Sequence, residues 1–214
     1  MFKPNQRKGA PLFPLNESEG EKTEALLKKY LKKWFTLSNK GRSFFGLYFG
    51  VMYNSEMYRR LQFLGLAQGL ESYHESFKER PTSRKWDNEI KVIKKFYPQI
   101  PRGCIDKIKD CHKPSYGARV AEVYGEHSEI ADKYFCTTKY FHTTDKKKDK
   151  FSKKVSKTRN YYSHSARGKK EKGVVYEEEM LPLIQDLQFL LHLAIMKEVG
   201  FTKQEIIQRY TLDK

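Results

Sequence analysis

Residues 177–200 read EEEMLPLIQDLQFLLHLAIMKEVG, a strongly apolar stretch near the end of a chain of 214 residues. Its apolar side chains recur mostly at steps of three and four residues, the spacing of the buried face of an α-helix. They include Leu183, Leu187, Leu190, Leu191 and Ala194. The pattern predicts a core helix over residues 177–199 that stops at Gly200 and carries Pro182 in its first turn or at a kink.

A second core helix is predicted just before this stretch. Phe151, Val155, Thr158 and Tyr162 follow one another at steps of four, three and four residues. On a helix with 3.6 residues per turn these positions lie within about 60° of one another, so they form a stripe that should face the core. Residues 167–173, rich in lysine and glycine, are expected to form the loop that joins the two helices.

The rest of the chain carries further helical patterns and almost no alternating strand pattern. A cap at Asn54 or Ser55 is expected for the long helix that follows them, and a break near residues 125–128 for a later one. Helical segments are predicted at residues 23–35, 57–77, 86–97, 105–111 and 116–135, and after a capping Thr202. The fold class is therefore all-α, a helical bundle with extra short helices in a middle insertion.

The domain organisation follows from the first residues of the chain. Residues 1–21 contain three prolines and two glycines among scattered charges, a composition typical of an extended tail or linker. We expect one helical domain over residues 22–214, preceded by this tail, to which an upstream domain would be attached.

Charge is the strongest compositional signal. The chain carries a formal net charge of +16, and residues 139–172 contain 13 Lys and Arg against 3 Asp and Glu. Such a surplus favours polyanionic partners, because basic side chains that neutralise phosphates release counterions. The alternative interpretation is a solvated lysine loop that only maintains solubility.

Membrane insertion and disulfide bonding are not expected. No apolar run approaches the roughly 18 residues of a membrane-spanning helix, and the first residues lack the apolar core of a secretion signal, so we expect a cytoplasmic protein. Three cysteines without an export signal should be reduced thiols. Cys111 and His112 with Cys104, Cys136 and His142 or His127 could be assembled into a zinc site, but their spacing matches no usual zinc motif, so no metal or cofactor is expected.

The motif with the clearest chemistry lies at the end of the second helix, where residues 158–165 read TRNYYSHS. Arg159 offers a planar fork of donors that can hold a phosphate, and His164 can take and return a proton near neutral pH. Five residues separate the two side chains by about 140° around a straight helix. They would meet only if the helix bends or if a second chain brings its own copy across a two-fold axis.

The arrangement resembles HEPN domains. The R-x4-H run with Asn160 directly after the arginine lies between a late helix and an apolar final helix, as in that family. An earlier run, residues 61–74, reads LQFLGLAQGLESYH and is similar to the long helix of the ApeA-like HEPN subgroup, found at the C-terminus of bacterial abortive-infection proteins. The resemblance extends over about residues 22–210.

This resemblance implies a metal-independent endoribonuclease that is dimeric, or a higher even oligomer, and serves anti-phage defence. In that scheme His164 removes the 2′-hydroxyl proton, Arg159 stabilises the charge on phosphorus, and Asn160 orients the imidazole or binds phosphate. RNA, with tRNA as a candidate, is the expected substrate, and an N-terminal sensor domain is the expected partner. Side chains expected to contact RNA are Lys153, Lys154, Lys157, Tyr161, Arg167, Lys169 and Lys170, and Glu71 and His74 are expected at the cleft.

Each assignment has a plainer alternative. Arg159 could be an exposed charge, Asn160 a surface amide, and His164 a residue that only satisfies carbonyls at a helix end. Glu71 and His74 could be buried polar residues that fix the register of neighbouring helices. As a whole, the domain could bind RNA or oligomerise without catalysis.

Overall fold

The computed structural model describes residues 20–54, 56–78, 83–111, 114–135, 144–164 and 171–211. Within these ranges the regular structure is helical and contains no strand, so the all-α prediction is confirmed. The α-helices are α1 (Gly20–Lys40), α2 (Arg42–Met52), α3 (Arg59–Phe77), α4 (Ser83–Phe96), α5 (Arg102–Cys111), α6 (Tyr116–Glu126), α7 (Ser128–Tyr134), α8 (Thr144–His164), α9 (Met180–Val199) and α10 (Lys203–Thr211).

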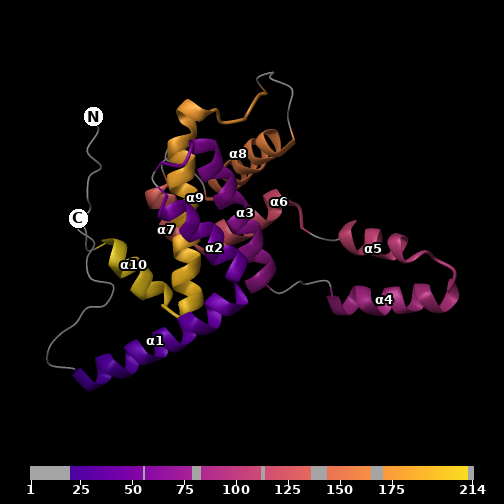
Figure 1. Ribbon diagram of the computed structural model, residues 1–214, viewed down its shortest axis with the longest axis horizontal. Helices are drawn as coiled ribbons and strands as arrows, with labels where there is room; N and C mark the ends of the chain where they lie inside the picture. Colours follow the sequence, from indigo (N-terminus) through magenta and orange to yellow (C-terminus); the bar gives the residue numbers. More distant parts are fainter. Residues whose placement is uncertain are drawn as a thin grey trace.

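Helices α3 and α9 lie side by side at the centre of the bundle, with α2, α6 and α8 packed around them (Figure 1). Apolar residues of α9 are buried along its length, as the 177–200 pattern predicts. The largest fully buried side chains include six from five helices, namely Phe44, Phe63, Tyr73, Tyr124, Phe151 and Leu187. The core therefore forms where the apolar faces of distant segments meet.

The ends of α9 and α10 follow their capping residues. Gly200 closes α9 with φ 110°, in the left-handed region, and a 3₁₀ turn over Glu177–Glu179 precedes the helix, which places Pro182 in its first turn. The Thr202 hydroxyl accepts a hydrogen bond from the Glu205 backbone N–H at 3.2 Å, and the Glu205 carboxylate accepts one from the Thr202 N–H at 2.6 Å. This reciprocal capping box confirms Thr202 as the cap of α10.

The predicted start of α3 is wrong. The helix begins at Arg59 with Tyr58 as its N-cap residue, and no side chain caps it. Asn54 instead belongs to the link after α2, where its carbonyl accepts a hydrogen bond from the Met57 N–H at 3.4 Å. The backbone therefore forms a turn at the place where the cap was predicted.

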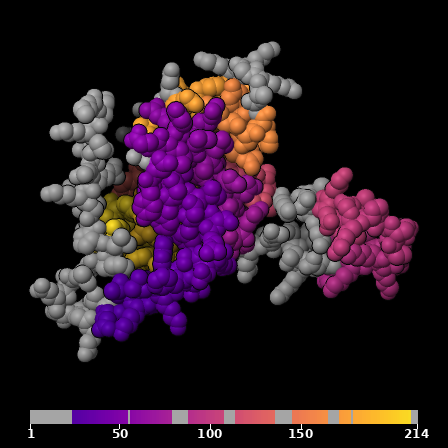
Figure 2. Space-filling view, viewed as in Figure 1, coloured from indigo at the N-terminus to yellow at the C-terminus, as the bar shows by residue number. Residues whose placement is uncertain are grey.

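The middle insertion contains an arm that extends away from the bundle. Helices α4 and α5 lie at a distance from the other helices in Figure 1, and their atoms stand apart from the body in the space-filling view of Figure 2. Val92, Phe96 and Tyr97 of the arm are more than half exposed. The break predicted near residues 125–128 is confirmed, because His127 separates α6 from α7.

None of the described helices is long and apolar enough to cross a membrane. The described residues contain no group of three or more His, Cys, Asp or Glu side chains able to hold a metal ion, and Cys136 and His142 lie outside those residues.

Candidate active site

Helix α8 has an inner and an outer face. Phe151, Val155 and Thr158 are buried and Tyr162 is half-buried against the core, so the predicted stripe is confirmed. The Thr158 hydroxyl accepts a hydrogen bond from the Val175 N–H at 3.1 Å, which ties the segment before α9 to α8. The inner face therefore fixes the rotation of α8 and decides which side chains point outward.

Exposed side chains line the opposite face. By helix geometry they lie about 200° from the centre of the core stripe. This outer row consists of Lys146, Lys150, Lys153, Lys157, Asn160 and His164, all exposed. It follows the length of the helix and ends at His164, the last residue of α8, among the unpaired carbonyls and at the negative end of the helix dipole.

Arg159 occupies the flank of α8 between these two faces. Its Nη2 donates to Glu71 Oε2 at 3.2 Å, its Nη1 donates to Asn160 Oδ1 at 3.3 Å, and its guanidinium carbon lies 5.2 Å from the centre of the Tyr116 ring. About a quarter of the Arg159 side chain is exposed, at 27%. The guanidinium is therefore held in a defined position from three sides and still reaches solvent.

Glu71 is shared between two arginines. One carboxylate oxygen faces Arg159, and the other lies 3.5 Å from Nη1 of Arg119, which is buried on α6. Arg119 also donates to Glu75 Oε1 at 3.1 Å and to the Pro114 carbonyl at 3.2 Å. Helices α3, α6 and α8 thus meet at one carboxylate.

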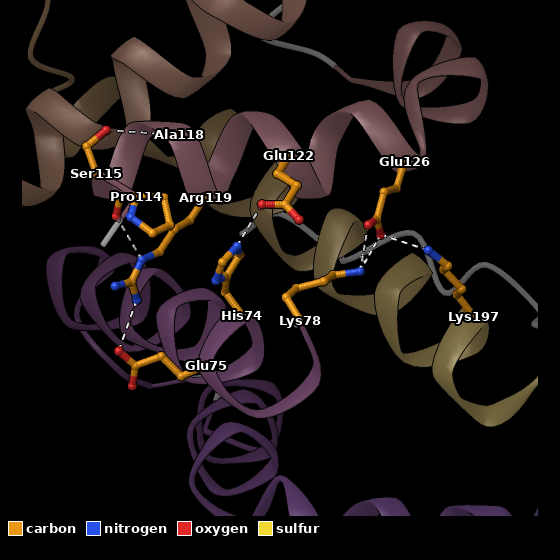
Figure 3. A network of polar contacts seen from close by, with 10 residues as sticks. All are labelled: His74, Glu75, Lys78, Pro114, Ser115, Ala118, Arg119, Glu122, Glu126 and Lys197. Atoms are coloured by element: carbon orange, nitrogen blue, oxygen red, sulfur yellow. Dashed lines mark hydrogen bonds and ion pairs between the residues drawn. The ribbon is translucent and has the colours of Figure 1, made fainter. Parts of the chain in front are cut away.

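A row of polar contacts, called here the polar ladder, joins α3 to α6 along their length (Figure 3). His74 Nε2 lies 2.8 Å from Glu122 Oε2, and Lys78 donates to Glu126, which also accepts from Lys197 of α9 at 2.9 Å. Burial disfavours the charged form of Glu126, but the hydrogen bonds from the two lysines outweigh it and lower the pKa of that carboxyl. His74 therefore lies in the helix-to-helix ladder, whereas Glu71 contacts the motif arginine.

The structure does not bring Arg159 and His164 together within one chain. Helix α8 continues unbroken from one to the other, so they remain about 140° apart around the axis and about 7.5 Å apart along it. Asn160 lies on the arc between them, touching Arg159 and sharing the outer row with His164. A single phosphate could contact an arginine and a histidine of this motif if α8 rearranged. Alternatively, a second chain could supply one of the two groups.

The remaining predicted contact residues fall into two groups. Lys153 and Lys157 are exposed on the outer row, Lys154 is half-buried beside it, and the Tyr161 ring packs edge-on against Tyr162 and Tyr176 at centroid distances of 5.1 and 5.6 Å. Arg167, Lys169 and Lys170 lie outside the described residues.

Two residues of the site were missed from the sequence, Tyr116 and Arg119 of α6. Burial raises the pKa of the Tyr116 hydroxyl far above its usual value, and that hydroxyl donates to the Ala67 carbonyl at 3.1 Å, so Tyr116 is a fixed neutral platform for the guanidinium. The available signal was an arginine among the apolar residues Ala118, Val120 and Ala121, which points to a buried charge in need of a carboxylate.

Comparison with known proteins supports the assignment of the fold. A family model described as Apea-like HEPN matches residues 64–205, more than half of the chain. The chain belongs to the ApeA-like HEPN family. No curated protein and no solved structure gives a significant match.

The matched region contains Glu71, Arg119, Arg159 and His164. HEPN domains are often ribonucleases, others serve as nucleotide-binding modules, and they commonly dimerise and bind RNA. The HEPN match is therefore compatible with a ribonuclease or with a nucleotide-binding module.

Proposed function

We propose that this HEPN domain is a metal-independent endoribonuclease whose reaction centre is formed by Arg159, Asn160 and His164. The observation that carries the proposal is the state of Arg159, which is oriented by Glu71, Asn160 and Tyr116 and yet reaches solvent beside a row of lysines that ends at a histidine. An arginine serving only solubility would need no such support.

The chemistry assigned to these groups is an in-line attack within RNA. His164 takes the proton of the ribose 2′-hydroxyl, and the 2′-oxygen forms a bond to the adjacent phosphorus. The bond from phosphorus to the 5′-oxygen breaks, that oxygen takes up a proton from water, and the protonated His164 returns its proton to solvent. The products carry a 2′,3′-cyclic phosphate and a 5′-hydroxyl, and the guanidinium of Arg159 stabilises the charge that builds on the phosphoryl oxygens.

We infer that the complete centre forms between two chains. Because the straight α8 separates Arg159 from His164, a two-fold axis beside the end of α8 would place Arg159 of one chain next to His164 of the other. Asn160 touches Arg159 of its own chain and would bind the phosphate between them.

The lysines of the outer row serve binding rather than chemistry. Lys146, Lys150, Lys153 and Lys157 are exposed and spaced by three or four residues, so they can follow a phosphate backbone toward His164.

We assign RNA, with tRNA as the first candidate, as substrate and abortive infection as the setting. Residues 22–214 would form the catalytic domain and residues 1–21 the link to an N-terminal sensor.

A second candidate function is RNA binding without cleavage, which the outer row alone would support. The two functions differ in turnover. In the presence of excess chelator, the enzyme should cut cellular RNA, leave DNA intact and yield cyclic phosphate ends.

The deciding variant is His164→Ala. We expect it to lower the cleavage rate by about 10² to 10⁴-fold while RNA affinity changes little, since the general base is lost and the lysines are kept. Unchanged cleavage by this variant would reject His164 as the base, and salt-sensitive binding without any product from the parent protein would favour the binding module.

A further inference from the structure

The arm of α4 and α5 has exposed apolar side chains that the core does not explain. Val92 and Phe96 of α4 are 53% and 69% exposed, and Tyr97, directly after the helix, is 57% exposed. Ile90 of the same helix is only 6% exposed, so α4 also has an apolar side that is covered. The exposed apolar residues therefore form a second surface, on a part of the chain that stands apart from the bundle (Figures 1 and 2).

Lysines flank these side chains on α4. Helix geometry places Lys91, Val92, Lys95 and Phe96 between about 100° and 240° around the axis from Ile90, on the opposite side of the helix. We call these four residues the arm face. Both lysines are exposed, and neither forms an ion pair with another described residue. The arm face therefore combines uncompensated positive charge with an exposed aromatic ring.

Charge along the whole arm has the same sign. Residues 83–111 contain 8 Lys and Arg against 4 Asp and Glu. A surface with this surplus attracts a polyanion, because the basic side chains can replace the counterions of its phosphates. Charge complementarity thus favours a nucleic acid or an anionic membrane as the partner of the arm face.

The arm joins the bundle beside Arg159. It leaves after Lys78, at the end of α3, and returns at Pro114, and both residues are labelled in Figure 3. The Pro114 carbonyl accepts a hydrogen bond from Arg119 Nε at 3.2 Å, and the centre of the Tyr116 ring lies 5.2 Å from the guanidinium carbon of Arg159. A strand bound along the arm would therefore reach the motif arginine from the side of α6.

The composition of the arm face favours a single strand of nucleic acid over a membrane. A helix that lies on a membrane offers it one continuous apolar face. In α4 the apolar side with Ile90 and Ile93 is buried or half-buried, and the exposed side mixes lysines with apolar residues. Proteins that bind single strands combine basic side chains for the phosphates with aromatic rings on which bases stack. A duplex keeps its bases inside the stack, where such a ring cannot reach them.

We propose that the arm binds an unpaired segment of the RNA substrate, with a base stacked on Phe96 and phosphates held by Lys91 and Lys95. This inference rests on the proposed function, in which RNA is the substrate, and adds a second contact surface to the outer row of α8. Because the arm returns to the bundle beside Arg159, RNA would be held on both sides of the reaction centre.

The test uses a single-stranded 2′-O-methyl RNA, which has no 2′-hydroxyl proton and so is not cut by the proposed reaction. Fluorescence anisotropy gives its affinity for the full chain, for Phe96→Ala and for the double variant Lys91→Ala with Lys95→Ala. We expect Phe96→Ala to weaken binding about five- to a hundredfold, the effect of one lost base–aromatic contact. The double variant should lower the slope of log affinity against log salt by about 1.4, because two phosphate contacts are lost.

The matched control is Tyr53→Ala. This substitution removes an aromatic side chain that is 83% exposed and has no Lys or Arg within four residues along the chain. It should leave the affinity unchanged. Unchanged affinity and salt slope in both arm variants would overturn the proposal. Binding of the parent protein to phosphatidylglycerol vesicles that is lost in Phe96→Ala, with RNA affinity unaffected, would overturn it in favour of a membrane contact.

Cleavage of unmodified RNA is measured separately, so that the two proposals can fail independently. If the parent protein cuts RNA and the arm variants bind the single strand as it does, only the role of the arm is rejected. If Phe96→Ala weakens binding as expected but the parent protein never cuts RNA, the arm is supported and the proposed reaction is rejected.

Discussion

Glu71 contacts two arginines, so its removal should disturb the contacts of both. Arg119 is buried and Arg159 is the motif arginine, and each faces one oxygen of the same carboxylate. A buried guanidinium that loses a carboxylate keeps its desolvation cost without the compensating contact.

We therefore expect Glu71→Ala to lower the free energy of unfolding by about 1–3 kcal/mol, less than a fully buried pair would cost, because Glu75 remains on Arg119 and Glu71 is partly exposed. Urea denaturation measures the change. Glu24→Ala, which breaks an exposed pair with Lys28, is the matched control and should change stability by less than about 0.5 kcal/mol. Equal effects of the two substitutions would contradict this account of Glu71.

His127 should make stability depend on pH on the acid side. Burial lowers its pKa to about 4 in the folded chain against an ordinary value of 6.5, so the unfolded chain binds more protons between these limits. The contribution is fully present above pH 6.5 and is lost as pH falls toward 4, by roughly 3 kcal/mol in all.

Replacement by leucine removes this titration, so the stability of His127→Leu relative to the parent protein should rise as pH falls from 6.5 to 4. Denaturant titrations at four pH values in that window measure the difference. The exposed His164, replaced by alanine, is the control. A constant difference between His127→Leu and the parent protein across the window would show that His127 is not the buried neutral group described here.

The Thr158 hydroxyl provides the buried hydrogen bond among the contacts that join the segment before α9 to helix α8. Thr158 is fully buried, and its hydroxyl accepts from the Val175 N–H inside the core. Thr158→Val keeps the shape of the side chain but leaves that N–H unpaired, which should cost about 1–3 kcal/mol.

Hydrogen exchange of the Val175 amide gives the direct measurement, and it should speed up markedly in Thr158→Val. Thr158→Ser keeps the hydroxyl and should retain most of the protection despite the lost methyl group. Similar protection in both variants would mean that packing rather than the hydrogen bond secures this segment.

Individual helices could be predicted from sequence because their signals are local. The core stripes of α8 and α9, the glycine that ends α9 and the capping Thr202 each act over a few residues and appear as predicted. The start of α3 was missed because the backbone after α2 forms its own turn. Helix α1 covers the segment predicted at residues 23–35, although its apolar residues Leu31 and Phe35 remain 46% and 63% exposed.

Contacts between helices could not be predicted from the sequence. Glu71, Arg119 and Arg159 are separated by 40 or more residues along the chain, and their meeting depends on how three helices pack. The sequence placed Glu71 near the motif through the family resemblance alone and gave no reason to include Tyr116. It did give the angle between Arg159 and His164, because that depends only on the straightness of α8.

On the scale of the whole molecule, the core, the basic surface and the arm occupy different places. Packed helices provide the core, α8 turns a basic outer row toward solvent, and the arm of α4 and α5 extends away from the bundle (Figure 1). A formal charge of +16 favours polyanionic partners, of which nucleic acid is one. The proposed cleavage makes a further demand, because Arg159 and His164, the two groups proposed for it, lie apart within one chain.

Mixing two inactive variants tests this claim most directly. Arg159→Ala and His164→Ala are each expected to be inactive alone. If each reaction centre takes its arginine from one chain and its histidine from the other, half of the randomly mixed dimers contain one intact centre out of two, so an equal mixture should recover roughly a quarter of the parent cleavage rate. Cleavage of RNA by the mixture, under conditions in which chains exchange, is the predicted result. A mixture as inactive as its components, while the parent protein cuts RNA as a dimer, would contradict a centre shared between chains.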